Sequence, residues 1–187
     1  DVANRVLIEH GDLAIDHTKT LAEITRAQAN GGFAAEHGLG LFQNRMKLEL
    51  AFEAPETALA SRRLRLTTRL ATTPIVYIAR EFPPESCAYR AGLEHELLHQ
   101  LYDREVLRAM PDEIRAITRQ VFAPDALDWA RPLDLGRLRD RFIRQFKYVY
   151  DGLSARRHQR IDSPEAYRRT SALCGGEITR LVASRGP

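Results

Sequence analysis

The sequence predicts an α+β fold in which a small antiparallel sheet is followed by a long helix and a mainly helical C-terminal half. Two segments, residues 45–53 and 63–70, alternate apolar and charged side chains with the twofold period of half-buried strands. After Pro83-Pro84 the apolar residues recur with helical spacing instead. A run of strands followed by a run of helices is typical of the α+β class.

The first element that we expect is a helix over residues 21–30. The segment His17-Thr18-Lys19-Thr20 precedes the run LAEITRAQAN, and Gly31-Gly32 follows it. A threonine in front of the first turn can cap the N–H groups there, and glycine commonly ends a helix. The flanking residues therefore predict both ends of this helix.

Three strands are expected after this helix. In residues 45–53 the apolar side chains fall on one face, and residues 63–70 alternate leucine with arginine in the same way, so a hairpin-like pairing is expected. Residues 75–79 are apolar on both faces, which predicts a more deeply buried third strand that ends before Pro83-Pro84.

Helices are expected in the rest of the chain. They cover residues 87–110, a second segment that begins at Pro111, residues 135–159 and residues 164–173, with Gly175-Gly176 breaking the last turns. An apolar series with helical spacing is expected to lie in the core rather than in a ligand pocket: Phe142, Phe146, Val149 and Leu153.

Length and composition indicate one water-soluble domain over residues 1–187, with a helix-and-sheet part (1–86) and a helical part (87–187). With 44% hydrophobic and 28% charged residues the chain is not disordered, and no apolar run reaches the roughly 18 to 20 residues of a membrane span. The net charge is only +3, but residues 129–187 contain 13 basic and 6 acidic residues, so the basic character is C-terminal.

The chain has two cysteines, Cys87 and Cys174, and no CxxC pair. One disulfide and two buried thiols are both compatible with this pattern. A Cys87–Cys174 disulfide would favour a periplasmic or secreted protein, because such bonds persist in oxidising compartments. Localisation is otherwise left open by the sequence.

The chemistry is carried by the HExxH motif His95-Glu96-Leu97-Leu98-His99 within the first long helix of the second half. Histidines four residues apart lie on one helix face, where two imidazole nitrogens can reach a single Zn²⁺ ion. Glu96 projects beside them and can act as general base and then as general acid. The motif predicts His95 and His99 as metal ligands and Glu96 as the catalytic residue.

Around this motif the sequence resembles the zincin metallopeptidases, whose signature has uncharged residues about HExxH and a hydrophobe two places beyond it. Leu93, Gln100 and Leu101 fit that pattern, whereas Gly92 stands where these enzymes more often have a β-branched residue. The resemblance covers residues 92–101, and more loosely the chain is similar to predicted exported bacterial zinc-dependent peptidases. It implies a zincin-like fold, a Zn²⁺ cofactor and a strand near the motif helix, here residues 75–80, that pairs with the substrate.

The third metal ligand is not fixed by the sequence. Asp103 follows His99 by one turn, but it is better placed to orient His99 than to bind the ion. Asp162 and Glu165 also read as an ordinary helix start, and His158 lies among arginines that oppose metal binding. The candidates are His158, Asp162, Glu165 and Asp103, followed by Asp151 and Glu113; a tyrosine could stabilise the oxyanion, with Tyr102, Tyr148, Tyr150 and Tyr167 as candidates.

Taken together, these features predict a zinc metallopeptidase that acts on a peptide or protein substrate. One alternative is a zinc amidase for cell-wall or other non-protein amides, because the same chemistry serves any amide. Another is a zincin-like binding or scaffold module, in which His95 and His99 are ordinary hydrogen-bonded helix residues. A basic helical nucleic-acid binder is the weaker alternative outside the enzymes. We expect no membrane span, and the oligomeric state is left open.

Overall fold

The structure is a computed structural model that describes residues 2–30, 39–53, 64–123 and 133–184. Within these ranges, a few side chains lie outside the description: Asn30, Arg157, His158, Tyr167, Ser171, Leu181, Val182 and Ser184. The chain divides into two compact units. The first consists of Asp1–Gly11, Met46–Thr72 and Arg104–Ala155, and the second of Asp12–Arg45, Thr73–Asp103 and Arg156–Pro187. The prediction of one domain over residues 1–187 stays a prediction.

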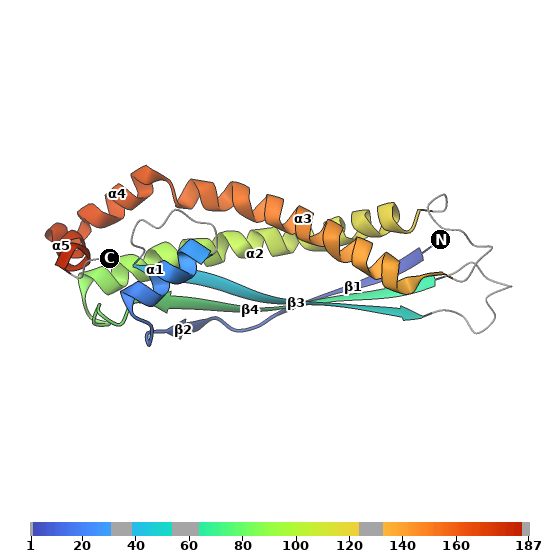
Figure 1. The fold of residues 1–187 in the computed structure, drawn as a ribbon, viewed down its shortest axis with the longest axis horizontal. Coiled ribbons are helices and arrows are strands. Elements are labelled where there is room, and N and C mark those ends of the chain that lie inside the picture. The colour runs from blue at the N-terminus through green and yellow to red at the C-terminus, as the bar shows by residue number, and fades with distance from the viewer. Residues whose placement is uncertain (1, 31–38, 54–63, 124–132, 185–187) are drawn as a thin grey trace. The chain divides into compact units, whose positions relative to one another are not determined.

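The described elements form a small sheet and a helical C-terminal half, which confirms the α+β class (Figure 1). In chain order they are β1 (Val2–His10), β2 (Ala14–Asp16), α1 (Leu21–Asn30), β3 (Gly40–Glu53), β4 (Leu64–Ile78), α2 (Cys87–Val121), α3 (Leu135–Ile161), α4 (Pro164–Ala172), the short 3-10 helix η2 (Leu173–Gly176) and α5 (Glu177–Ser184).

The prediction of an antiparallel sheet is wrong. Both N-terminal strands pair with β4 in parallel, β1 from Val2 opposite Leu64 onwards and β2 from Ala14 opposite Ile75 onwards, while β3 also pairs with β4. The sequence pattern predicts no strand before residue 17, because residues 2–10 alternate only weakly. Parallel pairing is possible because a long connection, which includes α1, separates β2 from β4.

Two prolines lie inside elements that they were expected to interrupt. Residues 63–70 and 75–79 were predicted as separate strands, but β4 runs through Pro74, which lies between the stretches of β4 that pair with β1 and with β2. At this position, the N–H that Pro74 lacks removes no hydrogen bond to β1 or to β2. Helix α2 likewise continues through Pro111, where Met110 and Ile114 are fully buried, so packing outweighs the local cost of proline.

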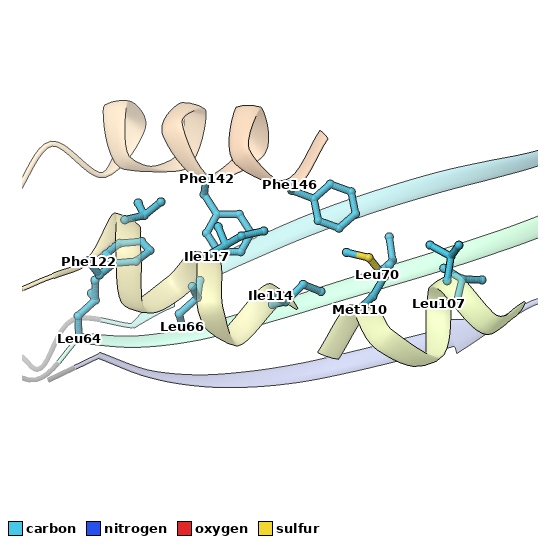
Figure 2. Packing of buried hydrophobic residues seen from close by; sticks show 12 residues of the cluster. Leu64, Leu66, Leu70, Leu107, Met110, Ile114, Ile117, Phe122, Phe142 and Phe146 are labelled. Carbon is cyan, nitrogen blue, oxygen red and sulfur yellow. The ribbon is translucent and has the colours of Figure 1, made fainter. Parts of the chain in front are cut away.

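The core of the first unit is formed by one face each of β4, α2 and α3. Figure 2 shows Phe142 and Phe146 of α3 pointing towards the apolar side chains of α2. Val149 and Leu153 pack against the same cluster, which confirms the predicted core series. The buried members of this cluster are Leu64, Leu66, Leu70, Val106, Leu107, Met110, Ile114, Ile117, Val121, Phe122, Phe142 and Phe146.

The core of the second unit holds the start of α2, which carries the HExxH motif. The imidazole Nε2 of His17 donates to the carbonyl oxygens of Ala79 at 3.1 Å and Phe82 at 2.8 Å, fixing the turn that precedes α2. A disulfide joins Cys87, the first residue of α2, to Cys174 in η2. The buried apolar residues here are Leu21, Ile24, Leu39, Tyr77, Ala79, Phe82, Ala88, Ala91 and Ile178.

Helix α1 begins as its preceding residues predict, whereas Gly31-Gly32, which were expected to end it, lie outside the described residues. The backbone N–H of Thr20 donates to the Glu23 carboxylate at 2.7 Å, and the N–H of Glu23 donates back to the Thr20 hydroxyl at 3.2 Å. This reciprocal pair is a capping box, which satisfies two N–H groups at the helix start. Among the described helices, none combines the length and the apolar character that crossing a membrane requires.

Candidate metal centre

Helix α2 brings the two motif histidines together on one face, one turn apart. The Nε2 atoms of His95 and His99 lie 3.3 Å from each other, and the ring centroids are 5.0 Å apart. Both side chains are largely buried. The spacing predicted from the sequence is therefore present in the structure.

A carboxylate from a distant part of the chain completes the group. Asp162 lies in the two-residue connection between α3 and α4, and its Oδ1 atom is 3.2 Å from Nε2 of His95 and 3.0 Å from Nε2 of His99. The N-cap of α4 is Ser163, whose hydroxyl accepts from the N–H of Ala166 at 3.1 Å. Ser163 therefore caps this helix, and Asp162 faces the histidines.

The geometry of the three ligand atoms fits a metal ion. Their distances of 3.0 to 3.3 Å match the edges of a tetrahedron about Zn²⁺, which are about 3.3 Å for ligands at 2.0 to 2.1 Å. Two imidazoles and one carboxylate are donors that Zn²⁺ accepts in catalytic sites, and the same set also suits Fe²⁺. Among the described residues, His95, His99 and Asp162 are the group of ligands close enough to hold an ion.

The electrostatics of this group favour a charged carboxylate. Burial raises the pKa of Asp162, but the hydrogen bonds from His95 and His99 outweigh burial and hold this pKa well below its usual range. Burial lowers the pKa of His95, but its hydrogen bond with Asp162 and the charge of Glu96 outweigh burial and raise this pKa. Asp162 therefore carries its negative charge at neutral pH, as a metal ligand must.

Glu96 is buried beside the ligands, on the side of α2 that contacts β3. Its side chain is only 5% exposed, and the backbone N–H of Phe42 donates to the carboxylate. Burial raises the pKa of Glu96, although His99, His95 and the N–H of Phe42 act in the opposite direction. A carboxylate whose pKa is raised towards neutrality is suited to accept and return a proton.

Two glycines allow α2 to lie this close to β3. A Cβ atom on Gly40 would lie 2.7 Å from Cγ of Glu96 and 2.7 Å from the carbonyl oxygen of Tyr77. A Cβ atom on Gly92 would lie 3.1 Å from Cβ of Leu39. The close approach explains why this chain has glycine at position 92, where the zincin pattern favours a β-branched residue.

The start of β3 was not predicted to contribute to the site. The alternation pattern begins only at residue 45, yet Gly40 and Phe42 contact Glu96, and the amide Nδ2 of Asn44 donates to Asp103 at 2.5 Å. The signal available in the sequence was Gly40 itself, because a glycine inside an apolar strand often marks a close backbone contact.

The strand expected to bind substrate is placed differently. Residues 75–77 pair with β2, and the N–H of Ala79 donates to Leu39 beside β3, so in the described part of the chain this strand is not an open edge. Its two-sided burial explains the placement, because both of its faces carry apolar side chains. The strand that contacts Glu96 is β3.

The other ligand candidates lie elsewhere. Asp103 is buried against Asn44, and Glu165 is exposed and paired with Arg169 in the first turns of α4. Asp151 is paired with Lys147 and, like Glu113, belongs to the first unit. The side chain of His158 lies outside the described residues.

The four tyrosines proposed as oxyanion stabilisers are also separated by the fold. Tyr102 follows His99 by three residues on α2 and is half-buried in the second unit. Tyr148 is 78% exposed and, like Tyr150, belongs to the first unit. The side chain of Tyr167 lies outside the described residues.

Comparison of the chain with protein-family models, with curated proteins and with solved structures finds no match. The functional argument therefore depends on the arrangement of His95, His99, Asp162 and Glu96 in this chain.

Proposed function

We propose that the protein is a zinc-dependent hydrolase that cleaves peptide bonds. The single observation that carries this proposal is the convergence of His95, His99 and Asp162 at distances of 3.0 to 3.3 Å, with Glu96 next to His95 in the sequence and interacting electrostatically with both histidines. These three residues would hold the ion, and a site with three protein ligands is typical of catalytic zinc, which also binds water or substrate.

When bound, Zn²⁺ would supply a Lewis acid that polarises the substrate carbonyl and makes water more acidic. The chain's own residues supply the ligands and the proton transfer. Asp162 contributes the negative charge, and His95 and His99 would contribute two imidazole nitrogens from one face of α2. Glu96, with its raised pKa, takes a proton from the attacking water and passes it to the leaving amine.

The disulfide supports a periplasmic or secreted location for this activity. Cys87 and Cys174 form the only disulfide that two cysteines allow, and such bonds persist outside the reducing cytoplasm. Extracellular peptides and proteins are therefore the substrate class that we propose.

The proposal is tested with purified protein loaded with one equivalent of Zn²⁺ and assayed on fluorescein-labelled casein and on a cell-wall peptide. Replacing Glu96 with glutamine should lower hydrolysis by about 10²- to 10⁴-fold, the usual contribution of general acid–base catalysis, and leave zinc content unchanged. The matched control is Glu94→Gln, an exposed glutamate two residues earlier on α2, which should retain full activity.

Full activity of the Glu96→Gln variant would contradict the proposed role of Glu96. Zinc-loaded wild-type protein that hydrolyses neither substrate would contradict the hydrolase proposal and favour a binding module. Hydrolysis of the cell-wall peptide but not of casein would contradict the peptidase proposal and favour an amidase.

A further inference from the structure

The disulfide joins the helix that carries both histidines to the segment that carries Asp162. We define the C-terminal arm as residues 162–184, which begins with Asp162 and contains α4, η2 and α5. Cys174 lies in the middle of this arm, and its Cα atom is 5.6 Å from that of Cys87, which begins α2. The third ligand and the two histidines are thus linked through a covalent bond outside the site.

Most of the described side chains of the arm are exposed or half-buried. Among its described side chains Ile178 is the only buried one, and Leu173 is 49% exposed. The three elements of the arm contact one another, so a bond to one of them restrains the others. On its other side Asp162 is held by α3, whose last residue, Ile161, is buried. The disulfide therefore adds a covalent restraint on the C-terminal side of Asp162, beside the packing of Ile178.

The backbone conformation at Cys174 favours a rearrangement of this residue once the disulfide is broken. Cys174 has φ of +62°, in the left-handed region, and Gly175 and Gly176 follow with φ of +58° and +77°. A residue with a Cβ atom is strained in this region, because the Cβ atom lies too close to the following carbonyl oxygen. A reduced Cys174 can leave this conformation, whereas the disulfide holds it there.

We infer that the Cys87–Cys174 disulfide is a positioning element for Asp162, so that the affinity of the site for a divalent metal falls when the disulfide is reduced. This inference rests on the proposed metal site. Both cysteines are partly exposed, so a dithiol can reach the bond. In that exchange two electrons and two protons pass to the protein: the S–S bond breaks, two thiols form, and the dithiol becomes its own disulfide.

The test is a double-mutant cycle on metal affinity, with Co²⁺ as the spectroscopic probe. The first change replaces both cysteines with serine, which removes the disulfide without introducing thiols that bind metal; the second is Asp162→Asn. With Asp162 present, the serine pair should raise the Kd for Co²⁺ about tenfold or more, as loss of a supporting partner does. In the Asp162→Asn background, the same serine pair should change the Kd by less than about twofold, because the carboxylate that the disulfide positions is gone.

If the serine pair changes the Kd for Co²⁺ equally in both backgrounds, or in neither, the inference about the disulfide is overturned. The proposed metal site is not contradicted by that result. Absence of Co²⁺ binding to the oxidised wild-type chain would overturn the metal site and the inference together.

A second measurement uses the wild-type chain and does not depend on the serine variant folding. Metal binding and disulfide formation are linked, so a metal that prefers the oxidised form must stabilise the disulfide by the same factor. Saturating Zn²⁺ should therefore shift the reduction midpoint by about 30 mV to more negative potential for each tenfold difference in affinity. An unchanged midpoint, or a shift of the same size in Asp162→Asn, would overturn the inference.

Discussion

At the residue scale, the proximity of the two histidines could be predicted from the sequence, whereas the position of Asp162 could not. Two histidines four apart on a helix must share a face, so the proximity of His95 and His99 is a local property. Asp162 and Glu165 are three residues apart and both carry a carboxylate, and only the fold shows that Asp162 faces the histidines while Glu165 pairs with Arg169. Contacts across sixty or more residues depend on packing that no local pattern encodes.

The closeness of α2 to β3 at Gly40 leads to a prediction about stability. Gly40→Ala should destabilise the protein by about 1 to 3 kcal/mol, because its Cβ atom would meet backbone oxygen that cannot move aside. The matched control is Gly152→Ala in α3, where a Cβ atom meets nothing within 4 Å and removal of a helical glycine should stabilise by about 0.5 to 1 kcal/mol. Urea unfolding of both variants checks the prediction, and equal stability of Gly40→Ala and wild type would contradict the described packing.

At the element scale, helix ends were predictable where side chains bond to nearby backbone. Helices α1 and α4 begin where Thr20 and Ser163 cap them. The rule that proline breaks an element is local, and it failed for β4 and α2. Pro74 lies between the stretches of β4 that pair with β1 and with β2, and Pro111 lies among buried residues. Strand β1 was missed because residues 2–10 alternate only weakly between apolar and polar side chains.

The capping box of α1 makes stability depend on pH. The backbone N–H of Thr20 donates to Glu23 and lowers the pKa of this carboxyl from its usual 4.5. Its contribution to stability is therefore complete above pH 4.5 and is lost as the pH falls through the lowered pKa. Wild type should have a higher Tm than Glu23→Gln at pH 7, and the difference should be smaller at pH 3, below the usual pKa of the carboxyl. A difference that is the same at both pH values would contradict a role for the charge.

At the scale of the whole molecule, the disulfide closes a large loop, since 87 positions separate Cys87 from Cys174. In the chain-entropy model such a cross-link contributes roughly 4 to 5 kcal/mol by restricting the unfolded chain. Replacing both cysteines with serine, in metal-free protein, should therefore lower the free energy of unfolding by about that amount. Denaturant titration with chelator present measures it, and an unchanged unfolding midpoint would show that the bond restrains neither the folded nor the unfolded chain.

The α+β class was predictable because alternation and helical spacing are properties of each segment. The parallel direction of the sheet was not, because it depends on β1 and β2, whose weak alternation gives no strand signal. The candidate metal site divides in the same way, with the histidine pair encoded locally and Asp162 brought to it by the fold.

The central claim is that His95, His99 and Asp162 bind one divalent metal ion. A crystal structure of the zinc-loaded protein, with anomalous scattering measured at the zinc edge, tests it most directly. We predict one anomalous peak per chain, bonded to Nε2 of His95, Nε2 of His99 and Oδ1 of Asp162 at about 2.0 to 2.2 Å. A peak bonded to other residues, or no peak between these three side chains, would contradict the account.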